Sequence, residues 1–520
     1  MKETESEAVC MLTFSNTFYH YLSRIMNFFF TFLFGSYALV GGFVAAPETP
    51  ADFTPVVRFA VCSDVHLNGD PDQAAALRLG WLFDDVYAYA EGETYTGLDA
   101  VLVVGDFATN GKPEEYELYN EIVDSHIKDG TEMLEVLGNH EFIHYRDEDA
   151  SVAYDVYKEY VYPEVDRHDV IGGYHFIGVS YDEDGKTFTK KMSWLREQLN
   201  AAVKDDPDKP IFVYQHPHPF STVYGSVNWS DLDVRLVLDN YPQVVDFSGH
   251  SHYASSDPRS IWQGSFTAVG TGSLSAYMSN LNYVDGDEDA PGESGGFWIV
   301  EEDADGNVRL QLYDISKRCF FDNIDYYLTD LGNTANRPYT WDTRIKLDSP
   351  PEFPEGAEAH IEWDSDGNAV LCFPDAVGYY EAENYKISVS DGSLIPIWTD
   401  TVVSDYVRAG LTGVRVNIGK LDPGTYTVQI TACSPYEREG QTLLTEVTVG
   451  DTPVLPGDVN GDGEVTAIDA RLALRASVGL EDFSDDPAAF TACDTDRDGV
   501  ITAMDARRIL RASVGFAAIL

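Results

Sequence analysis

Short apolar runs alternate with helical segments between residues 52 and 332. Each run has the length of one buried strand, and the segments between several runs carry apolar residues at helical spacing. Strands that alternate with helices are typical of a layered α/β domain, whose strand ends commonly carry the functional side chains. The predicted strands are Val56–Cys62, Ala100–Val104, Met133–Leu137, Tyr174–Val179, Ile211–Tyr214 and Val244–Phe247, with a closing hairpin of Phe297–Val300 and Val308–Tyr313; the predicted helices are Asp72–Ala90, Glu114–His126 and Ser193–Val203.

From about Thr340 the pattern becomes all-β, with strands separated by Gly, Pro and Asp. It predicts a small β-sandwich over residues 340–450, interpreted as a spacer or, alternatively, as a carbohydrate-binding module. Within it, Leu421–Tyr426 resembles the turn that leads into a strand of fibronectin type III modules. Prolines then predict a short, stiff linker over residues 451–456. The predicted strands are His360–Trp363, Ala369–Phe373, Tyr385–Val389, Val414–Ile418, Tyr426–Ala432 and Leu444–Val449.

The N-terminal segment is apolar and uncharged from Phe28 to Ala46, follows Arg24 and ends in Val-Ala-Ala. An apolar run that closes on small residues is typical of a cleaved signal peptide, which we place at residues 1–46. The alternative is an uncleaved membrane anchor, because the run approaches the ~20 residues of a membrane-spanning helix. In either case the rest of the chain is expected outside the cytoplasm.

Net charge and cysteine positions bear on two further properties, nucleic-acid binding and disulfide formation. The 520 residues include 87 Asp and Glu against 34 Lys and Arg, a net charge of −53. Such a surface repels polyanions and argues against dedicated nucleic-acid binding. The six cysteines are scattered, and strand alternation turns the one tempting pair, Cys372 and Cys433, away from the sandwich core. We therefore expect no obligatory disulfide.

Five islands of metal-ligand residue types follow apolar strands in the α/β region. Carboxylate, imidazole and amide ligands without thiolates suit Mn, Fe, Zn or Ni rather than a structural zinc site. Two such ions ~3.5–4 Å apart can generate hydroxide and clamp a phosphate ester. Side chains two residues apart in an extended segment project to the same side. The two side chains of Asp-x-His, and those of His-x-His, can therefore converge on one metal site. The islands are Asp64-Val65-His66, Gly105-Asp106, Gly138-Asn139-His140-Glu141, His216 and Gly249-His250-Ser251-His252.

This order of motifs is similar to that of the calcineurin-like metallophosphoesterase superfamily, over Phe53–Asp330. The resemblance implies a four-layer α/β/β/α sandwich, placed here at residues 52–332. It also implies hydrolysis of a phosphomonoester or phosphodiester through metal-bound hydroxide. By the same resemblance, one metal ion is held by Asp64, His66 and His252, the other by Asn139, His216 and His250, and both by Asp106.

The resemblance assigns catalytic roles to Asp106 and His140, with His140 beside the leaving group as electrostatic stabiliser or general acid. Glu141 is expected to orient its turn. His218 is the alternative to His216, which is preferred because it directly ends a strand. Purple acid phosphatases carry Tyr three residues after the bridging Asp, whereas this chain has Thr109, so no tyrosinate–iron colour is expected.

Two similar segments, Gly457–Leu480 and Cys493–Phe516, end the chain. Each has oxygen ligands at the first, third and fifth places of a loop, Gly at the sixth and Asp at the twelfth, which is calcium-loop spacing. The repeat closely resembles an all-α, calcium-binding type I dockerin, placed at residues 457–520. The predicted ligands of two Ca²⁺ are Asp458, Asn460, Asp462, Glu464 and Asp469 in the first loop and Asp494, Asp496, Asp498, Val500 and Asp505 in the second.

A dockerin implies calcium-dependent docking to a cohesin module of a scaffoldin in a bacterial cell-surface complex, and the repeat suggests two similar binding faces. The combined prediction is a secreted, otherwise monomeric two-metal phosphoesterase attached to that complex. The alternatives are a non-catalytic glycan- or surface-binding component with a vestigial metal site, and a calcium-only scaffold component. The complete ligand set favours the enzyme.

Overall fold

The computed structural model describes residues 46–278, 294–364, 367–393, 395–410, 413–449, 456–461, 463–483, 487–495 and 499–514. The predicted signal peptide, apart from Ala46, and the predicted linker, apart from Pro456, lie outside these ranges. Within them, no helix combines the length and apolarity that crossing a membrane requires.

Two six-stranded sheets form the first part of the molecule. Both contain adjacent parallel strands, with antiparallel strands toward one edge of the first sheet and at both edges of the second. The first has the order β14 (Cys319–Leu328), β13 (Val308–Asp314), β12 (Gly296–Asp303), β1 (Pro55–Cys62), β2 (Ala100–Val104) and β3 (Glu132–Val136). The second has the order β10 (Ile261–Gln263), β11 (Thr267–Gly270), β9 (Val244–Ser248), β6 (Ile211–Tyr214), β5 (Tyr174–Gly178) and β4 (Arg167–Ile171).

The two sheets face each other across an apolar core. Successive side chains of a strand point to opposite faces, so Phe59 of β1 belongs to this core while its neighbour Ala60 faces the helices. The Phe59 ring packs against Phe176, Phe212 and Phe247 of the other sheet, at centroid distances of 5.1, 4.8 and 6.0 Å. This packing fixes the two sheets relative to each other.

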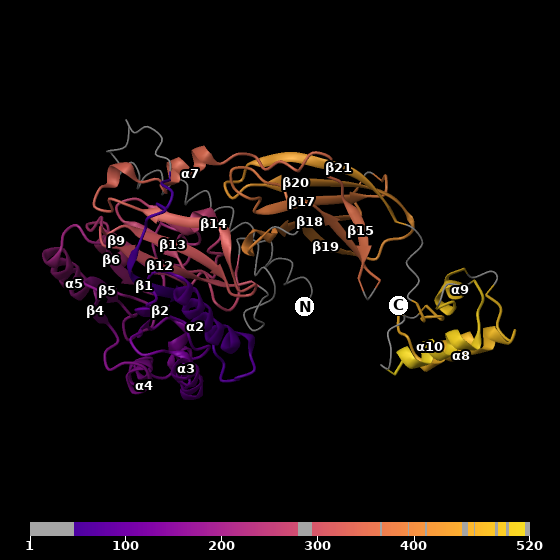
Figure 1. Ribbon diagram of the computed structural model, residues 1–520, viewed down its shortest axis with the longest axis horizontal. Helices are drawn as coiled ribbons and strands as arrows, with labels where there is room; N and C mark the ends of the chain where they lie inside the picture. The colour runs from indigo at the N-terminus through magenta and orange to yellow at the C-terminus, as the bar shows by residue number, and fades with distance from the viewer. Residues whose placement is uncertain are drawn as a thin grey trace.

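Helices pack on the outer faces of the sheets, with α2 beside α3 and α5 beside α6 (Figure 1). The four-layer α/β/β/α order expected from the resemblance is confirmed. The helices are α2 (Ala74–Gly92), α3 (Pro113–His126), α4 (Val152–Tyr160), α5 (Met192–Asp205) and α6 (Leu232–Leu238).

A β-sandwich follows, as expected, but the region from Thr340 is not entirely β. It begins with a short helix, α7 (Trp341–Leu347), because the Thr340 hydroxyl accepts from the Thr343 N–H and caps it. The Tyr426 hydroxyl donates to the Asp422 carbonyl at 2.7 Å and fixes the turn before β20. The sheets have the orders β15 (His360–Trp363), β16 (Ala369–Phe373), β19 (Val414–Gly419) and β18 (Trp398–Val403), β17 (Asn384–Ser390), β20 (Gly424–Cys433), β21 (Glu439–Val449).

The five cysteines of the described ranges are free thiols. Cys372 and Cys433 stay outside the apolar core of the sandwich, while Leu371 beside Cys372 belongs to it. Both cysteines are nevertheless buried.

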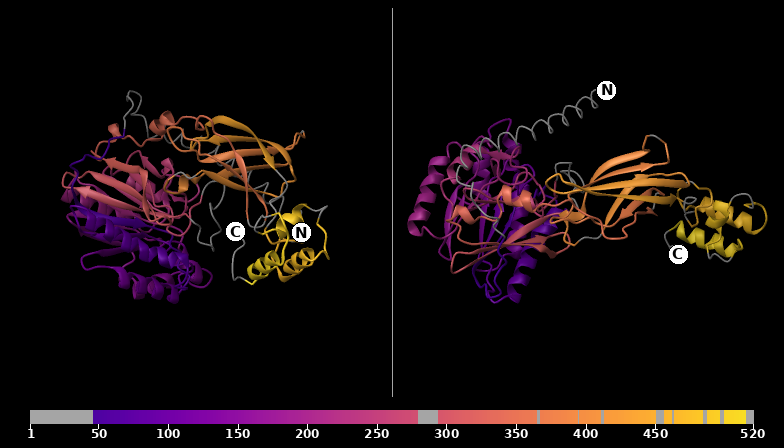
Figure 2. Two further views of the ribbon diagram at one scale, coloured as in Figure 1. Left: turned by 45° about the vertical axis from the view of Figure 1, so that its right-hand side comes forward. Right: turned by 90° about the horizontal axis from the view of Figure 1, so that it is seen from above.

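Three helices end the described chain: α8 (Ala467–Ser477), α9 (Pro487–Cys493) and α10 (Ala503–Ala512). Helices α8 and α10 pack against each other around a small core that includes Ala473 and Ile509. Figures 1 and 2 show the three helices beyond the end of the β-sandwich that lies away from the two large sheets.

Candidate metal centre

The predicted ligands lie just beyond the ends of β1, β2, β3, β6 and β9. The carboxyl ends of parallel strands share one edge of a sheet, which is where α/β folds usually bind ligands. Backbone pairing continues past β1 and β2, because the N–H of Asp64 donates to Gly105 O at 3.1 Å and that of His66 to Asp106 O at 3.0 Å. These hydrogen bonds hold the first two islands side by side.

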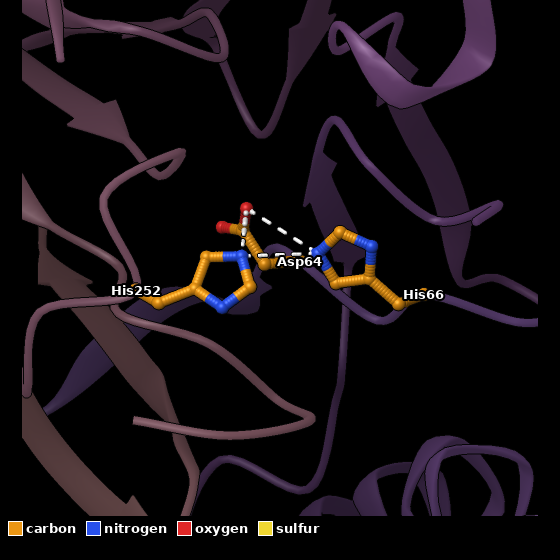
Figure 3. Close-up of side chains that lie close together, drawn as sticks. All are labelled: Asp64, His66 and His252. Carbon is orange, nitrogen blue, oxygen red and sulfur yellow. Dashed lines mark hydrogen bonds and ion pairs between the residues drawn. The ribbon is translucent and has the colours of Figure 1, made fainter. Parts of the chain in front are cut away.

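Asp64, His66 and His252 form one cluster (Figure 3). His252 Nε2 lies 3.1 Å from Asp64 Oδ1 and 3.0 Å from His66 Nε2, and His66 Nε2 lies 3.9 Å from Asp64 Oδ1. All three residues are buried. Two ring nitrogens and a carboxylate oxygen directed at one point form a donor set that suits a transition-metal ion.

His216, Asp106 and Asn139 form a second cluster. His216 Nδ1–H donates to the Val104 carbonyl at 2.9 Å, which leaves Nε2 to face Asp106 Oδ2 at 2.8 Å and Asn139 Oδ1 at 3.1 Å. These are three electron-rich atoms at contact distance, so the cluster requires a proton or a cation among them. The donor set fits a metal ion.

Asp106 connects the clusters. Its carboxylate belongs to two sets of close ligand atoms, one with His66 and His140 and the other with His216 and His250. Within each set the ligand atoms lie within 4.8 Å of one another. His216 Nε2 is 3.9 Å from Asp64 Oδ1, so the clusters are adjacent. The structure brings all the predicted transition-metal ligands together; whether they bind metal stays a prediction.

Five of these ligands have a left-handed backbone. The φ angles are +52° at Asp64, +54° at His66, +53° at Asp106, +71° at His250 and +54° at His252. Non-glycine residues rarely adopt this conformation, which persists only where the surroundings impose it. The expectation that each pair converges through an extended segment is therefore wrong, because the pairs lie beyond their strands in strained turns.

Two motif glycines leave room for carboxylates. A Cβ atom at Gly138 would lie 2.1 Å from Asp106 Oδ1, and one at Gly249 would lie 2.4 Å from Asp64 Oδ2. Because real Cβ atoms do not approach so closely, a larger residue at either position would displace a predicted ligand.

Buried polar residues hold the ligand turns in place. Glu141 accepts from the backbone N–H groups of Asp106, Ala108 and Gly138, at 3.1, 2.9 and 2.6 Å, and so ties the turns after β2 and β3. These contacts are of the kind expected from the sequence, in which Glu141 orients its turn. Sequence reasoning missed Ser63, which donates to Asp64 and contacts Thr271 at 2.7 Å.

Thr109 also positions ligands. Its carbonyl accepts from His140 Nδ1 at 2.8 Å, and its hydroxyl donates to the His66 carbonyl at 2.8 Å. His218, the alternative to His216, contacts Ser248 and Ser251 hydroxyls through both ring nitrogens, at 2.9 and 2.8 Å. It therefore braces the loop after β9, and the geometry favours His216 as the ligand.

Charge pairing controls protonation at the centre. Burial opposes the charged form of His216, but Asp106 and Asp64 raise its pKa to about 9. Burial lowers the pKa of His66 and of His250 to about 3. Against the effect of burial, neighbouring histidines hold the pKa of Asp64 and of Asp106 below their usual range. In the metal-free chain, protons on histidine therefore balance the two carboxylates.

The C-terminal loops repeat one arrangement. Asp458 Oδ2 accepts from the Gly463 N–H at 2.9 Å, and Asp494 Oδ2 accepts from the Gly499 N–H at 2.7 Å. The twelfth-place Asp469 and Asp505 are fully buried, and each accepts from N–H groups at both ends of its loop. Asn460, Glu464 and Val500 lie in these loops, whereas Asp462, Asp496 and Asp498 fall outside the described residues.

Residues 57–254 match the family model described as calcineurin-like phosphoesterase, and residues 456–512 match that of the dockerin type I domain. The chain contains a calcineurin-like phosphoesterase domain and a type I dockerin. The phosphoesterase match includes each island of predicted transition-metal ligands. The dockerin match includes both calcium loops.

Two solved structures resemble the chain distantly. The purple acid phosphatase PPD1 from yellow lupin (Lupinus luteus) seeds is 13% identical over 55% of this chain, with a TM-score of 0.40, and the chain spans 56% of its length. The endo-β-1,4-mannanase from Thermotoga petrophila is 11% identical over 76% of this chain and 98% of its own, with a TM-score of 0.21. No curated protein matches the chain.

Metal binding by the phosphoesterase domain should release protons. With a pKa of about 9, His216 is protonated at neutral pH in the metal-free chain and must lose that proton to bind a cation. Titration calorimetry of the metal-free chain with Mn²⁺, in buffers of different ionisation enthalpy, should detect about one or more protons released at pH ~7. The apparent affinity should rise with pH up to about 9; a pH-independent affinity without proton release would contradict this assignment.

Proposed function

We propose that the protein is a secreted, metal-dependent phosphoesterase that hydrolyses a phosphomonoester or phosphodiester and is attached through its dockerin to a cohesin-bearing extracellular complex. The observation that carries the proposal is the convergence of Asp64, Asp106 and His216, with the other predicted ligands, at the shared edge of parallel strands. We further propose the divisions 52–332 for the phosphoesterase, 340–450 for the sandwich and 457–520 for the dockerin.

The site divides into two ligand groups, in which Asp64, His66 and His252 would hold one ion and Asn139, His216 and His250 the other. Asp106 is close to both groups and would be shared. Two divalent or trivalent transition ions bound there (Mn, Fe, Zn or Ni) would polarise the phosphoryl oxygens and activate the attacking water. The completeness of this set supports catalysis over the alternative of a vestigial site on a surface-binding protein.

Substrate would approach from the side of Asn139, His140 and His250, which are only partly buried while the other ligands are buried. His140 donates through Nδ1 to Thr109 O, and this hydrogen bond fixes the orientation of its other ring nitrogen, Nε2. In our proposal this nitrogen stabilises the leaving oxygen or delivers a proton to it.

Trp229 would form one wall of this entrance. It is 39% exposed, and its ring lies edge-to-face with the His250 ring at a centroid distance of 5.1 Å. Two backbone hydrogen bonds hold it: His218 N–H donates to Trp229 O, and Trp229 N–H donates to Gly225 O, both at 3.1 Å. A rigid, exposed indole suits an ester that carries a flat or ring-shaped group.

The dockerin supports the attachment. Two pairs of apolar residues at equivalent places in the repeat are about equally exposed: Ile468 and Met504 at 51% and 53%, and Leu474 and Leu510 at 48% and 47%. Exposed apolar residues at matching places mark binding surfaces more strongly than scattered ones. We propose that each helix of the pair α8 and α10 can present its own face to a cohesin.

Removing a shared or single-ion ligand should abolish hydrolysis. Asp106→Ala and Asn139→Ala should each lower aryl phosphate turnover below about one per cent of the wild type, because an ion loses an oxygen ligand. Asn200→Ala, on the outer helix α5, is the matched control and should remain active. Near-full activity of either ligand variant, with circular dichroism unchanged, would defeat the proposal.

Trp229→Ala should discriminate among substrates. Loss of a stacking surface worth about 1 kcal/mol predicts a roughly fivefold higher KM for phenyl phosphate. The KM for glycerol phosphate should change little. Val227→Ala, an exposed residue of the same loop, serves as the control. Equal losses for both substrates would contradict a role in recognising the ring.

Cohesin capture should require calcium and tolerate loss of one face. In pull-downs with a panel of type I cohesins, a chelator should abolish capture, because the loops order only around Ca²⁺. Ile468→Asp or Met504→Asp alone should retain capture, and the double variant should lose it. Capture without calcium would contradict the assignment of the loops.

A further inference from the structure

A buried ion cluster joins the phosphoesterase domain to the β-sandwich. The guanidinium of Arg259 pairs with Asp257 through two contacts, at 2.8 and 2.6 Å, and with Glu383 of the sandwich at 2.6 Å. Exposed fractions are 9% for Arg259, 0% for Asp257 and 2% for Glu383. Buried charges are tolerated only when paired, so each side of this contact depends on the other.

The same arginine makes further contacts across the boundary. Its Nη1 atom donates to Pro435 O of the sandwich at 2.5 Å, and its guanidinium stacks on the Tyr224 ring at 3.8 Å. The Tyr224 hydroxyl donates to Glu383 at 3.0 Å. The contact is therefore a connected network rather than a single surface ion pair, and such networks couple their members strongly.

An apolar contact lies beside the cluster. The sandwich contributes Tyr406 and Val407 from the 3₁₀ helix η4 (Asp405–Val407), which pack with Ala254 and Tyr277 of the phosphoesterase domain. Tyr406 is 3% exposed and Val407 1%. Separating the two parts would expose both faces of this contact to water.

This contact lies directly behind the predicted ligand loop. Ala254 is two residues after His252, and its N–H donates to Met278 O at 3.2 Å, while the Met278 N–H donates to His252 O at 2.7 Å. Asp257, the partner of Arg259, donates through its N–H to Ala254 O at 3.1 Å. The sandwich thus covers Ala254, which directly follows the His252 turn and is hydrogen-bonded to Met278, the residue that holds the His252 carbonyl.

The loop needs such support. His250 and His252 have φ angles of +71° and +54°, a strained conformation that persists only when the surrounding structure imposes it. The β9 strand fixes the loop at Ser248. At the other end of the loop, the sandwich packs against Ala254, and its Tyr406 hydroxyl donates to Asp257 at 3.3 Å. Without the sandwich, Arg259 and Ala254 would become exposed and the strain could relax.

We propose that the β-sandwich is a structural part of the metal centre, which positions the loop of residues 249–257, and hence His250 and His252, through Glu383 and the segment 405–407. This inference replaces the interpretation of the sandwich as a spacer. It rests on the proposed function only in taking the two histidines as ligands. Glu383 and Val407 act as positioning residues, because neither touches the predicted ligand atoms.

Glu383→Gln in the full chain tests the ionic part. Hydrogen–deuterium exchange of the peptide covering residues 249–257, measured without metal, should accelerate about tenfold as the loop opens more often. Affinity for Mn²⁺ should fall about tenfold, as it does when residues behind metal ligands are altered. The matched control is Glu381→Gln, whose contact with Asn323 is exposed, and it should change neither quantity.

A second pair of variants separates positioning from general stability. Val407→Ala trims the contact with the ligand loop, whereas Val428→Ala removes the same volume from the sandwich's own core. Only Val407→Ala should accelerate exchange at residues 249–257, weaken Mn²⁺ binding and lower kcat with KM unchanged.

Three outcomes decide between the proposals. Wild-type exchange and Mn²⁺ affinity in both folded interface variants, Glu383→Gln and Val407→Ala, would overturn the positioning role. Equal effects of Val407→Ala and Val428→Ala would also overturn it, because general destabilisation would then explain the loss. A wild type that binds Mn²⁺ but hydrolyses no phosphate ester would defeat the proposed function alone, since the exchange experiment needs no activity.

Discussion

The structure depends on one constraint: hydrogen-bond acceptor atoms that repel one another must be held close together in its interior. The buried Asp64, Asp106 and His216 and the partly buried Asn139 bring carboxylate, imidazole and amide atoms within 3.9 Å of the His216 Nε2 atom. Like charges and lone pairs cannot gather in a low-dielectric site unless positive charge lies among them. Parallel strands of both sheets bring the acceptors to this point, and buried glutamate, serine and threonine side chains hold the turns against their repulsion.

Holding these atoms requires support on every side. Glu141 ties the turns after β2 and β3, Ser63 and Thr271 hold the turn after β1, and His218 braces the loop after β9. The β-sandwich supports the far end of the same loop through Arg259 and Glu383. The strained turns of the predicted ligands therefore account for ordered polar contacts made by residues that are not themselves predicted ligands.

The sequence pattern was sufficient to predict those features whose residues are neighbours along the chain. The main strands of both sheets follow from their apolar runs, and the ligands from their motifs. Short or edge strands such as β4, β7 (His218–Pro219) and β10 lack a continuous apolar run, and sequence reasoning missed them. The Arg259–Glu383 contact and the edge of Trp229 against His250 join distant segments, so no local pattern could predict them.

The central claim is that the converging acceptors bind two transition-metal ions. Elemental analysis of the full chain after reconstitution and removal of free metal tests it most directly, with calcium counted separately for the dockerin. The account predicts about two transition ions per chain, and fewer after substitution of Asp64. A folded chain that retains none would show that protons alone balance these buried carboxylates, and that result would contradict the account.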